Sequence, residues 1–192
     1  MHELEMINGE AAMAYAGEEP WHGLGKKVPA DLSPEQMLKT ANLDWEVESR
    51  PLFYETASGK TMRTKKRAIV RATDDKLMTV VSDEWHPVQN LQAFKFFDDF
   101  VKAGSMQMHT AGSLKGGKLV WAMAKINESF EIFGGDKIDG YLLFSNPHEF
   151  GRSIDVRFTP IRVVCNNTLT FALDSESASS VKVSHRSAFD PD

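Results

Sequence analysis

The residues best suited to chemistry lie in one basic segment before the middle of the chain. Residues 60–71 read KTMRTKKRAIVR and hold six basic side chains and no acidic one. Lysine and arginine bind nucleic acids by neutralising phosphates. In a strand these side chains alternate between two faces, with Lys65 and Arg67 on one and Lys66 on the other. The segment predicts a surface that follows a phosphate backbone, with binding residues Arg63, Lys65, Lys66, Arg67 and Arg71.

Aromatic side chains near this segment can supply base stacking, which is the second requirement for binding a single strand. The candidates are Phe53, Tyr54 and Trp85. Lys115 and Lys118 flank a glycine-rich turn and can form a second basic cluster. Because neither face of the basic strand is purely basic, a strand face that is simply solvated is the alternative interpretation.

Residues 112–119, GSLKGGKL, come close to the phosphate-binding loop G-x-x-x-x-G-K-[ST]. Leu119 replaces the hydroxyl residue that binds magnesium in such loops. The following residues alternate as a strand, whereas a phosphate-binding loop must precede a helix. We therefore interpret these glycines as a hairpin turn and expect no nucleotide hydrolysis there.

Cys165 is the single cysteine and the one weak candidate for a catalytic nucleophile. It lies between a predicted strand and a predicted helix start, where the helix dipole lowers the pKa of a thiol. Packing is the favoured interpretation, because no histidine is adjacent in sequence, although His22, His109 or His148 can approach in space. The six histidines show no H-x-H, H-x-x-H or H-x-x-x-H spacing, so we expect neither a metal site nor a cofactor.

Capping and turn signals divide the chain into elements that would position these residues. Residues 33–36, SPEQ, form a capping box that begins a helix to about Ala41. Segments 45–56, 61–72 and 77–82 predict a three-stranded antiparallel meander. The other expected elements are a helix over 90–104, a hairpin of 106–113 and 118–126, strands 138–145 and 152–164, and a helix over 166–173. The order α-β-β-β-α-β-β-β-β-α indicates an α+β fold with antiparallel sheets and a long helix packed across them.

The length of 192 residues suits one domain. We expect an N-terminal arm over 1–19, a single α+β domain over 20–173, and a Ser-rich linker with a C-terminal strand or tail over 174–192. The net charge of −5 argues against a protein wrapped wholesale in nucleic acid. No apolar run is long enough to span a bilayer, and one cysteine suits a reducing compartment, so we expect a cytoplasmic protein that does not bind membranes.

Four separated blocks carry a resemblance: PWHGLG at 20–25, VVSDEWHPVQNLQAFKFFDDF at 80–100, HTAGSLKGGKLVWAMAK at 109–125 and RFTPIRVVCNNTL at 157–169. Together they resemble the phage/plasmid-like proteins of the domain-of-unknown-function 932 family, which phages, prophages and plasmids encode. The resemblance implies a mobile element in a bacterial host cell, but no activity. The family-motif residues, to which it assigns no roles, are Trp21, His22, Gln89, Asn90, Arg162, Cys165, Asn166 and Asn167.

Three functions from different classes remain open. The first is a DNA-metabolism protein that binds or anneals single-stranded DNA without catalysis and works as a homo-oligomer. Its β-β-β-α order is similar to the core of phage and eukaryotic single-strand annealing proteins, which is fold-level analogy. The second is a module that binds and inhibits a host defence or regulatory protein, to which an acidic pI of about 5.7 is suited. The third is an enzyme that uses Cys165.

Overall fold

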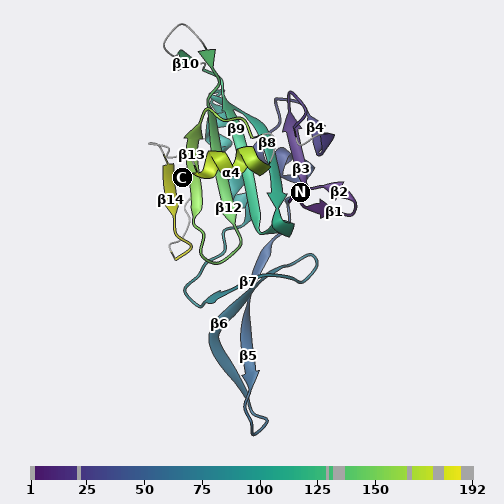
Figure 1. The fold of residues 1–192 in the computed structure, drawn as a ribbon, viewed down its shortest axis with the longest axis vertical. Helices are drawn as coiled ribbons and strands as arrows, with labels where there is room; N and C mark the ends of the chain where they lie inside the picture. Colours follow the sequence, from purple (N-terminus) through teal and green to yellow (C-terminus); the bar gives the residue numbers. More distant parts are fainter. Residues whose placement is uncertain are drawn as a thin grey trace.

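The computed structural model describes residues 3–20, 23–128, 130–131, 137–163, 166–174 and 180–186. A seven-stranded sheet with the strand order β14-β13-β12-β9-β8-β3-β4 forms its centre (Figure 1). Its neighbouring strands pair antiparallel, except for the parallel pair β3 and β4. The strands are β3 (Met13–Ala16), β4 (Lys26–Val28), β8 (Met106–Leu114), β9 (Leu119–Ile126), β12 (Tyr141–Pro147), β13 (Ile154–Thr159) and β14 (Ser180–Val183). The fold is α+β with mostly antiparallel sheets, as expected.

Helices cover both faces of this sheet. Side chains on β9 alternate strictly, so that Trp121 and Met123 enter one hydrophobic core and Ala122 enters the other. The helix α4 (Asn166–Asp174) packs on the Trp121 face and crosses the strands in Figure 1. On the opposite face lie α1 (Pro34–Thr40), α2 (Asn90–Lys95) and α3 (Asp98–Lys102). The period-two pattern of β9 thus places small residues under three helices and large ones under α4.

The long helix expected over 90–104 is wrong, because α2 ends at Lys95 and α3 begins at Asp98. Phe94 and Phe97 are fully buried, and the ring of Phe96 packs at 5.6 Å from that of Phe144. On a straight helix with 3.6 residues per turn, Phe94 and Phe96 would point in nearly opposite directions. The break between the two short helices lets both rings face the sheet.

The expected element order is incomplete, because four short strands precede α1. β1 (Met6–Ile7) and β2 (Glu10–Ala11) form a two-stranded sheet, while β3 lies between β4 and β8 in the central sheet. All four residues of β3 are buried, so the strand shows no alternation of buried apolar and exposed polar residues. β10 (Phe130–Glu131) and β11 (Lys137–Ile138) form a further short pair that was also not expected. The segment expected to be an N-terminal arm therefore contributes a strand to the central sheet.

A second sheet of three antiparallel strands confirms the predicted meander. Its strands are β5 (Val47–Glu55), β6 (Thr61–Arg71) and β7 (Lys76–Ser82), in the order β5-β6-β7. At its root, Val47, Ile69 and Val81 are buried in the core that they share with α1 and α2. Beyond the root, the β5–β6 hairpin extends away from the rest of the molecule (Figure 1).

Candidate nucleic-acid interface

The distal part of the β5–β6 hairpin, residues 51–66, is named here the projecting hairpin. Each of its residues is exposed or half-buried, and none belongs to a hydrophobic core. Its backbone is held by the ladder between the two strands and by the turn in which the amide of Gly59 donates to the carbonyl of Thr56 at 2.9 Å. Apart from the pairing of Lys66 with Ser82 of β7, the segment is held by its own strand pairing, and its side chains are accessible to a ligand.

The projecting hairpin is the part of the sequence-predicted site where positive charge reaches solvent. It carries four cations and a single carboxylate, that of Glu55. The cations Lys60, Arg63, Lys65 and Lys66 are exposed, and none of them makes an ion pair within the described part of the chain. Unpaired surface cations on a protrusion form a local positive field in a protein whose net charge is −5.

A bulge in β6 sets the direction of two of these lysines. Pro51 pairs with Arg67 and Phe53 with Arg63, so β6 contains two more residues than β5 between these pairs. The hydroxyl of Thr64 donates to the carbonyl of Leu52 at 3.0 Å and accepts from the amide of Lys66 at 3.0 Å. Bulges redirect side chains and interrupt pairing. Lys65 and Lys66 consequently lie on an irregular stretch of strand.

Two aromatic rings lie on opposite faces of the projecting hairpin. Phe53 is 56% exposed and is paired with Arg63, while Tyr54 is 53% exposed and is paired with Met62. Residues that pair directly across strands share a face, and neighbours in a strand do not. Each face thus offers one aromatic ring. Trp85, the third stacking candidate, is buried and its ring is stacked at 4.3 Å on that of His185.

The two remaining cations of the basic segment stabilise the root of the hairpin. Arg67 donates from its guanidinium to the hydroxyl and the carbonyl of Ser49. Arg71 is 6% exposed and forms ion pairs at 2.7 Å with both Glu5 and Asp74. The bonds to Asp74 raise the pKa of Arg71 and lower that of Asp74. Neither guanidinium presents its charge on the projecting hairpin.

Lys115 and Lys118 lie at the turn between β8 and β9, beside the root of the hairpin. The turn passes so close to β7 that a Cβ on Gly116 would approach the Nζ of Lys76 to 2.2 Å. Lys115 and Gly116 both adopt positive φ, as the tight turn requires. The structure therefore does not bring Lys115 and Lys118 onto the projecting hairpin.

Two family-motif residues, Gln89 and Asn90, clamp the root of the hairpin. The side chain of Gln89 bonds to both the amide and the carbonyl of Val47 at 2.9 Å. Asn90 is buried and donates from Nδ2 to the carbonyl of Leu43 at 2.9 Å, while its Oδ1 lies 2.9 Å from Nε2 of His148. His148 is fully buried, and the loss of hydration lowers its pKa to about 3. These contacts fix the position of β5 against the central sheet.

Three other family-motif residues, Arg162, Asn166 and Asn167, follow β13 in the chain and do not contribute to this clamp. Arg162 donates to the carboxylate and to the carbonyl of Glu18, both at 2.6 Å. Asn166 is the first residue of α4, and Asn167 is exposed in its first turn. Trp21, His22 and Cys165 lie outside the described residues, so the catalytic interpretation of Cys165 stays a prediction.

The described residues contain no group of three or more His, Cys, Asp or Glu side chains that could hold a metal ion. Among the helices described, none has both the length and the apolar character needed to cross a membrane.

Comparison with known proteins gives a match to a family model described as "Domain of unknown function (DUF932)", over residues 77–192. No curated protein and no solved structure matches the chain. The match begins in β7, so the clamp residues Gln89 and Asn90 lie inside it and the projecting hairpin lies outside it.

Proposed function

The chain belongs to the domain-of-unknown-function 932 family, whose model matches more than half of it, and we propose that it binds single-stranded DNA through the projecting hairpin without catalysis. One observation carries the proposal: a hairpin without core contacts holds unpaired cations beside two exposed aromatic rings. This combination is typical of surfaces that bind single strands, in which cations follow the phosphates and rings stack on bases.

The arrangement of the cations favours contact with the DNA backbone over recognition of the base sequence. Lysine and arginine contacts to phosphates position a nucleic acid but carry no sequence information. Lys65 and Lys66 are adjacent at the bulge, and Arg63 lies on the Phe53 face of the same strand. A strand of DNA lying along β6 would meet these charges in succession, whichever bases it carries.

The exposed rings favour single-stranded over duplex DNA. Phe53 and Tyr54 are each more than half exposed and have no aromatic partner among the described ring contacts. Stacking on a side chain requires an accessible base face, which a duplex keeps inside its own stack. Each base stacked on an aromatic side chain contributes about 1–3 kcal/mol. We therefore assign the rings to unpaired bases.

The biological setting of the proposal follows from the resemblance to phage and plasmid proteins. We place the protein in the cytoplasm of a bacterial host, in the DNA metabolism of a mobile element, where it anneals single strands as a homo-oligomer. The succession β5-β6-β7-α2 is similar in order to the core of single-strand annealing proteins. This fold-level analogy supports only the proposal that the process is strand annealing.

Binding to a host protein is the second candidate function, and one observation favours it. An acidic cavity lies at the root of the hairpin, where DNA phosphates would be repelled.

Fluorescence anisotropy of a labelled oligothymidine tests the proposed function. We expect binding at low salt, and a log–log plot of the association constant against salt concentration should have a slope of about −0.7 for each phosphate contact. The complementary duplex should bind more weakly, because its base faces are not available to Phe53 and Tyr54. Absence of binding at low salt, or equal affinity for both forms, would refute the proposal.

A further inference from the structure

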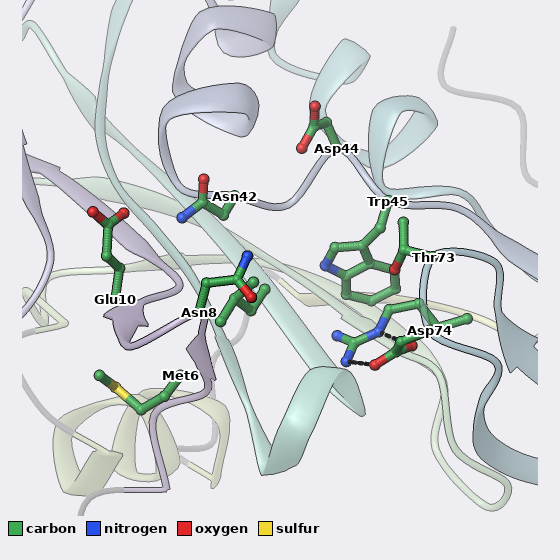
Figure 2. A pocket seen from close by; sticks show the side chains of 10 residues that line it. Met6, Asn8, Glu10, Asn42, Asp44, Trp45, Thr73 and Asp74 are labelled. Carbon is green, nitrogen blue, oxygen red and sulfur yellow. Dashed lines mark hydrogen bonds and ion pairs between the residues drawn. The ribbon is translucent and has the colours of Figure 1, made fainter.

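A cavity of about 590 Å³ opens where three turns meet at the root of the hairpin (Figure 2). Its walls come from the β1–β2 turn with Asn8, the connection from α1 to β5 with Asn42 and Asp44, and the β6–β7 turn with Asp74. The buried residues Trp45 and Arg71 also line it. The space is large enough to hold an amino-acid side chain together with part of its main chain.

Negative charge dominates the lining of this cavity. It contains three carboxylates, those of Glu10, Asp44 and Asp74, against the single guanidinium of Arg71. Lys26 neutralises Glu10 at 2.7 Å, and Arg71 neutralises Asp74 at 2.7 Å. Asp44 is exposed and makes no ion pair in the part of the chain that the structure describes. Lys39, whose charge interacts with Asp44, forms its ion pair with Glu35, so the carboxylate of Asp44 remains able to attract a cation and repel a phosphate.

Trp45 supplies a hydrogen-bond donor that has no partner. The side chain is 6% exposed, and its indole Nε1 is buried without a hydrogen-bond acceptor among the described residues. Figure 2 shows the nitrogen-bearing edge of the ring turned toward Asn8 and Asn42, on the wall opposite. An unpaired buried donor costs about 1–3 kcal/mol, which a ligand acceptor would recover.

The ring of Trp45 is not open for stacking. The guanidinium of Arg71 lies 5.1 Å from its centroid, and the ring of His148 lies 5.2 Å away. With so little of the side chain exposed, a nucleobase has no aromatic face to cover. The acidic lining disfavours the phosphate of a nucleotide for an independent reason. Nucleotides are therefore poor candidates for this cavity.

We propose that the cavity binds a basic residue of a peptide, arginine or lysine, through two groups at once. The cationic end of the side chain faces the carboxylate of Asp44, and a main-chain carbonyl accepts from the indole Nε1 of Trp45. Asn8 and Asn42 provide amide oxygens to the remaining donors of a guanidinium. The site is distinct from the projecting hairpin, and its charge has the opposite sign.

Isothermal titration calorimetry of the full chain with three related probes tests separately the contributions of the cationic end and of the main-chain carbonyl. N-acetyl-arginine amide carries the cation and the carbonyl, N-acetyl-citrulline amide carries the carbonyl with a neutral isostere, and butylguanidine carries the guanidinium without the carbonyl. We expect the arginine derivative to bind, the citrulline derivative to bind at least tenfold more weakly, and butylguanidine to bind several-fold more weakly. Equal affinities for the arginine and citrulline derivatives, or no heat from the former at millimolar concentration, would overturn the proposal.

The variant Asp44→Asn provides the matched test on the protein. Asp44 is exposed, so the substitution should leave the fold intact while weakening the arginine derivative at least tenfold. Asp31→Asn, which removes the same charge from an exposed position outside the cavity, should leave binding unchanged. If the two variants bind alike, the cavity is not the site. Binding of oligothymidine should not weaken in either variant, which separates this proposal from the proposed function.

Discussion

Replacement of Arg63, Lys65 and Lys66 together by alanine is expected to weaken binding to oligothymidine at least tenfold at low salt. If each cation contacts one phosphate, the loss of three contacts should also reduce the magnitude of the salt slope by about 2. These side chains are exposed and without ion pairs in the described chain, so the free energy of unfolding should change by no more than about 0.5 kcal/mol. Fluorescence anisotropy at several salt concentrations measures both quantities.

A second triple variant shows whether the loss of affinity depends on the position of the removed charges or only on their number. Lys27, Lys95 and Lys182 are likewise exposed and unpaired in the described chain, but they lie on β4, α2 and β14. Their replacement by alanine changes the net charge by the same amount and should reduce affinity much less. Equal losses in the two variants would mean that only net charge matters, and the hairpin would then have no special role.

Arg71→Met is expected to lower the free energy of unfolding by about 3–5 kcal/mol, the range found when one partner of a buried ion pair is removed. Glu5 is 5% exposed and its carboxylate is held by Arg71 at 2.7 Å and by the hydroxyl of Ser113 at 2.7 Å. Without Arg71 the carboxylate remains buried with only the hydroxyl as a partner. Urea unfolding followed by circular dichroism measures the change.

Two further variants distinguish a buried charge from an ordinary loss of packing. Glu5→Gln combined with Arg71→Met removes both charges and should recover part of the stability that Arg71→Met loses. Arg50→Met breaks exposed ion pairs with Glu48 and Asp75 on the same sheet and should cost no more than about 1 kcal/mol. An effect of Arg71→Met as small as that of Arg50→Met would contradict the buried network described here.

Local signals in the sequence were sufficient to predict much of the fold. Turn residues at 58–59 and 73–75 separated the strands of the meander, and the alternation along residues 118–126 identified the strand β9. The helix start at Ser33 is confirmed, since its hydroxyl accepts from the amide of Gln36 and the Gln36 side chain accepts in return. Each of these signals depends on neighbours within a few residues of one another.

The elements that were missed depend on contacts between distant segments. β3 is buried on both faces and is only four residues long, so the large-small alternation of MAYA is too short to distinguish a strand from other buried segments. One signal could have revealed the preceding strands: Asn8-Gly9 is the pair preferred in two-residue hairpin turns, and both residues have positive φ. The cavity could not be predicted, because three turns separated in sequence form it.

The basic segment was predicted as one surface, but the fold uses its residues in two ways. Arg67 and Arg71 have the same charge as Lys65 and lie an even number of residues from it, so strand periodicity predicts one face for all three. In the structure the two arginines bond instead to Ser49, Glu5 and Asp74. What separates the two groups is where β6 leaves the core: residues 68–71 are buried, Arg67 is half-buried at the boundary, and Lys65 and Lys66 beyond it are exposed. Strand periodicity predicts which face of a strand a residue occupies, but it does not predict how far along the strand the core extends.

The most direct measurement of the central claim is an amide NMR titration of the protein with oligothymidine at low salt. We predict that the shifted amides are concentrated in residues 51–66, with Phe53, Tyr54, Lys65 and Lys66 among the largest changes, and that the shifts diminish as salt is added. Shifts concentrated at the cavity, on α4 or elsewhere on the central sheet, with residues 51–66 unchanged, would contradict it.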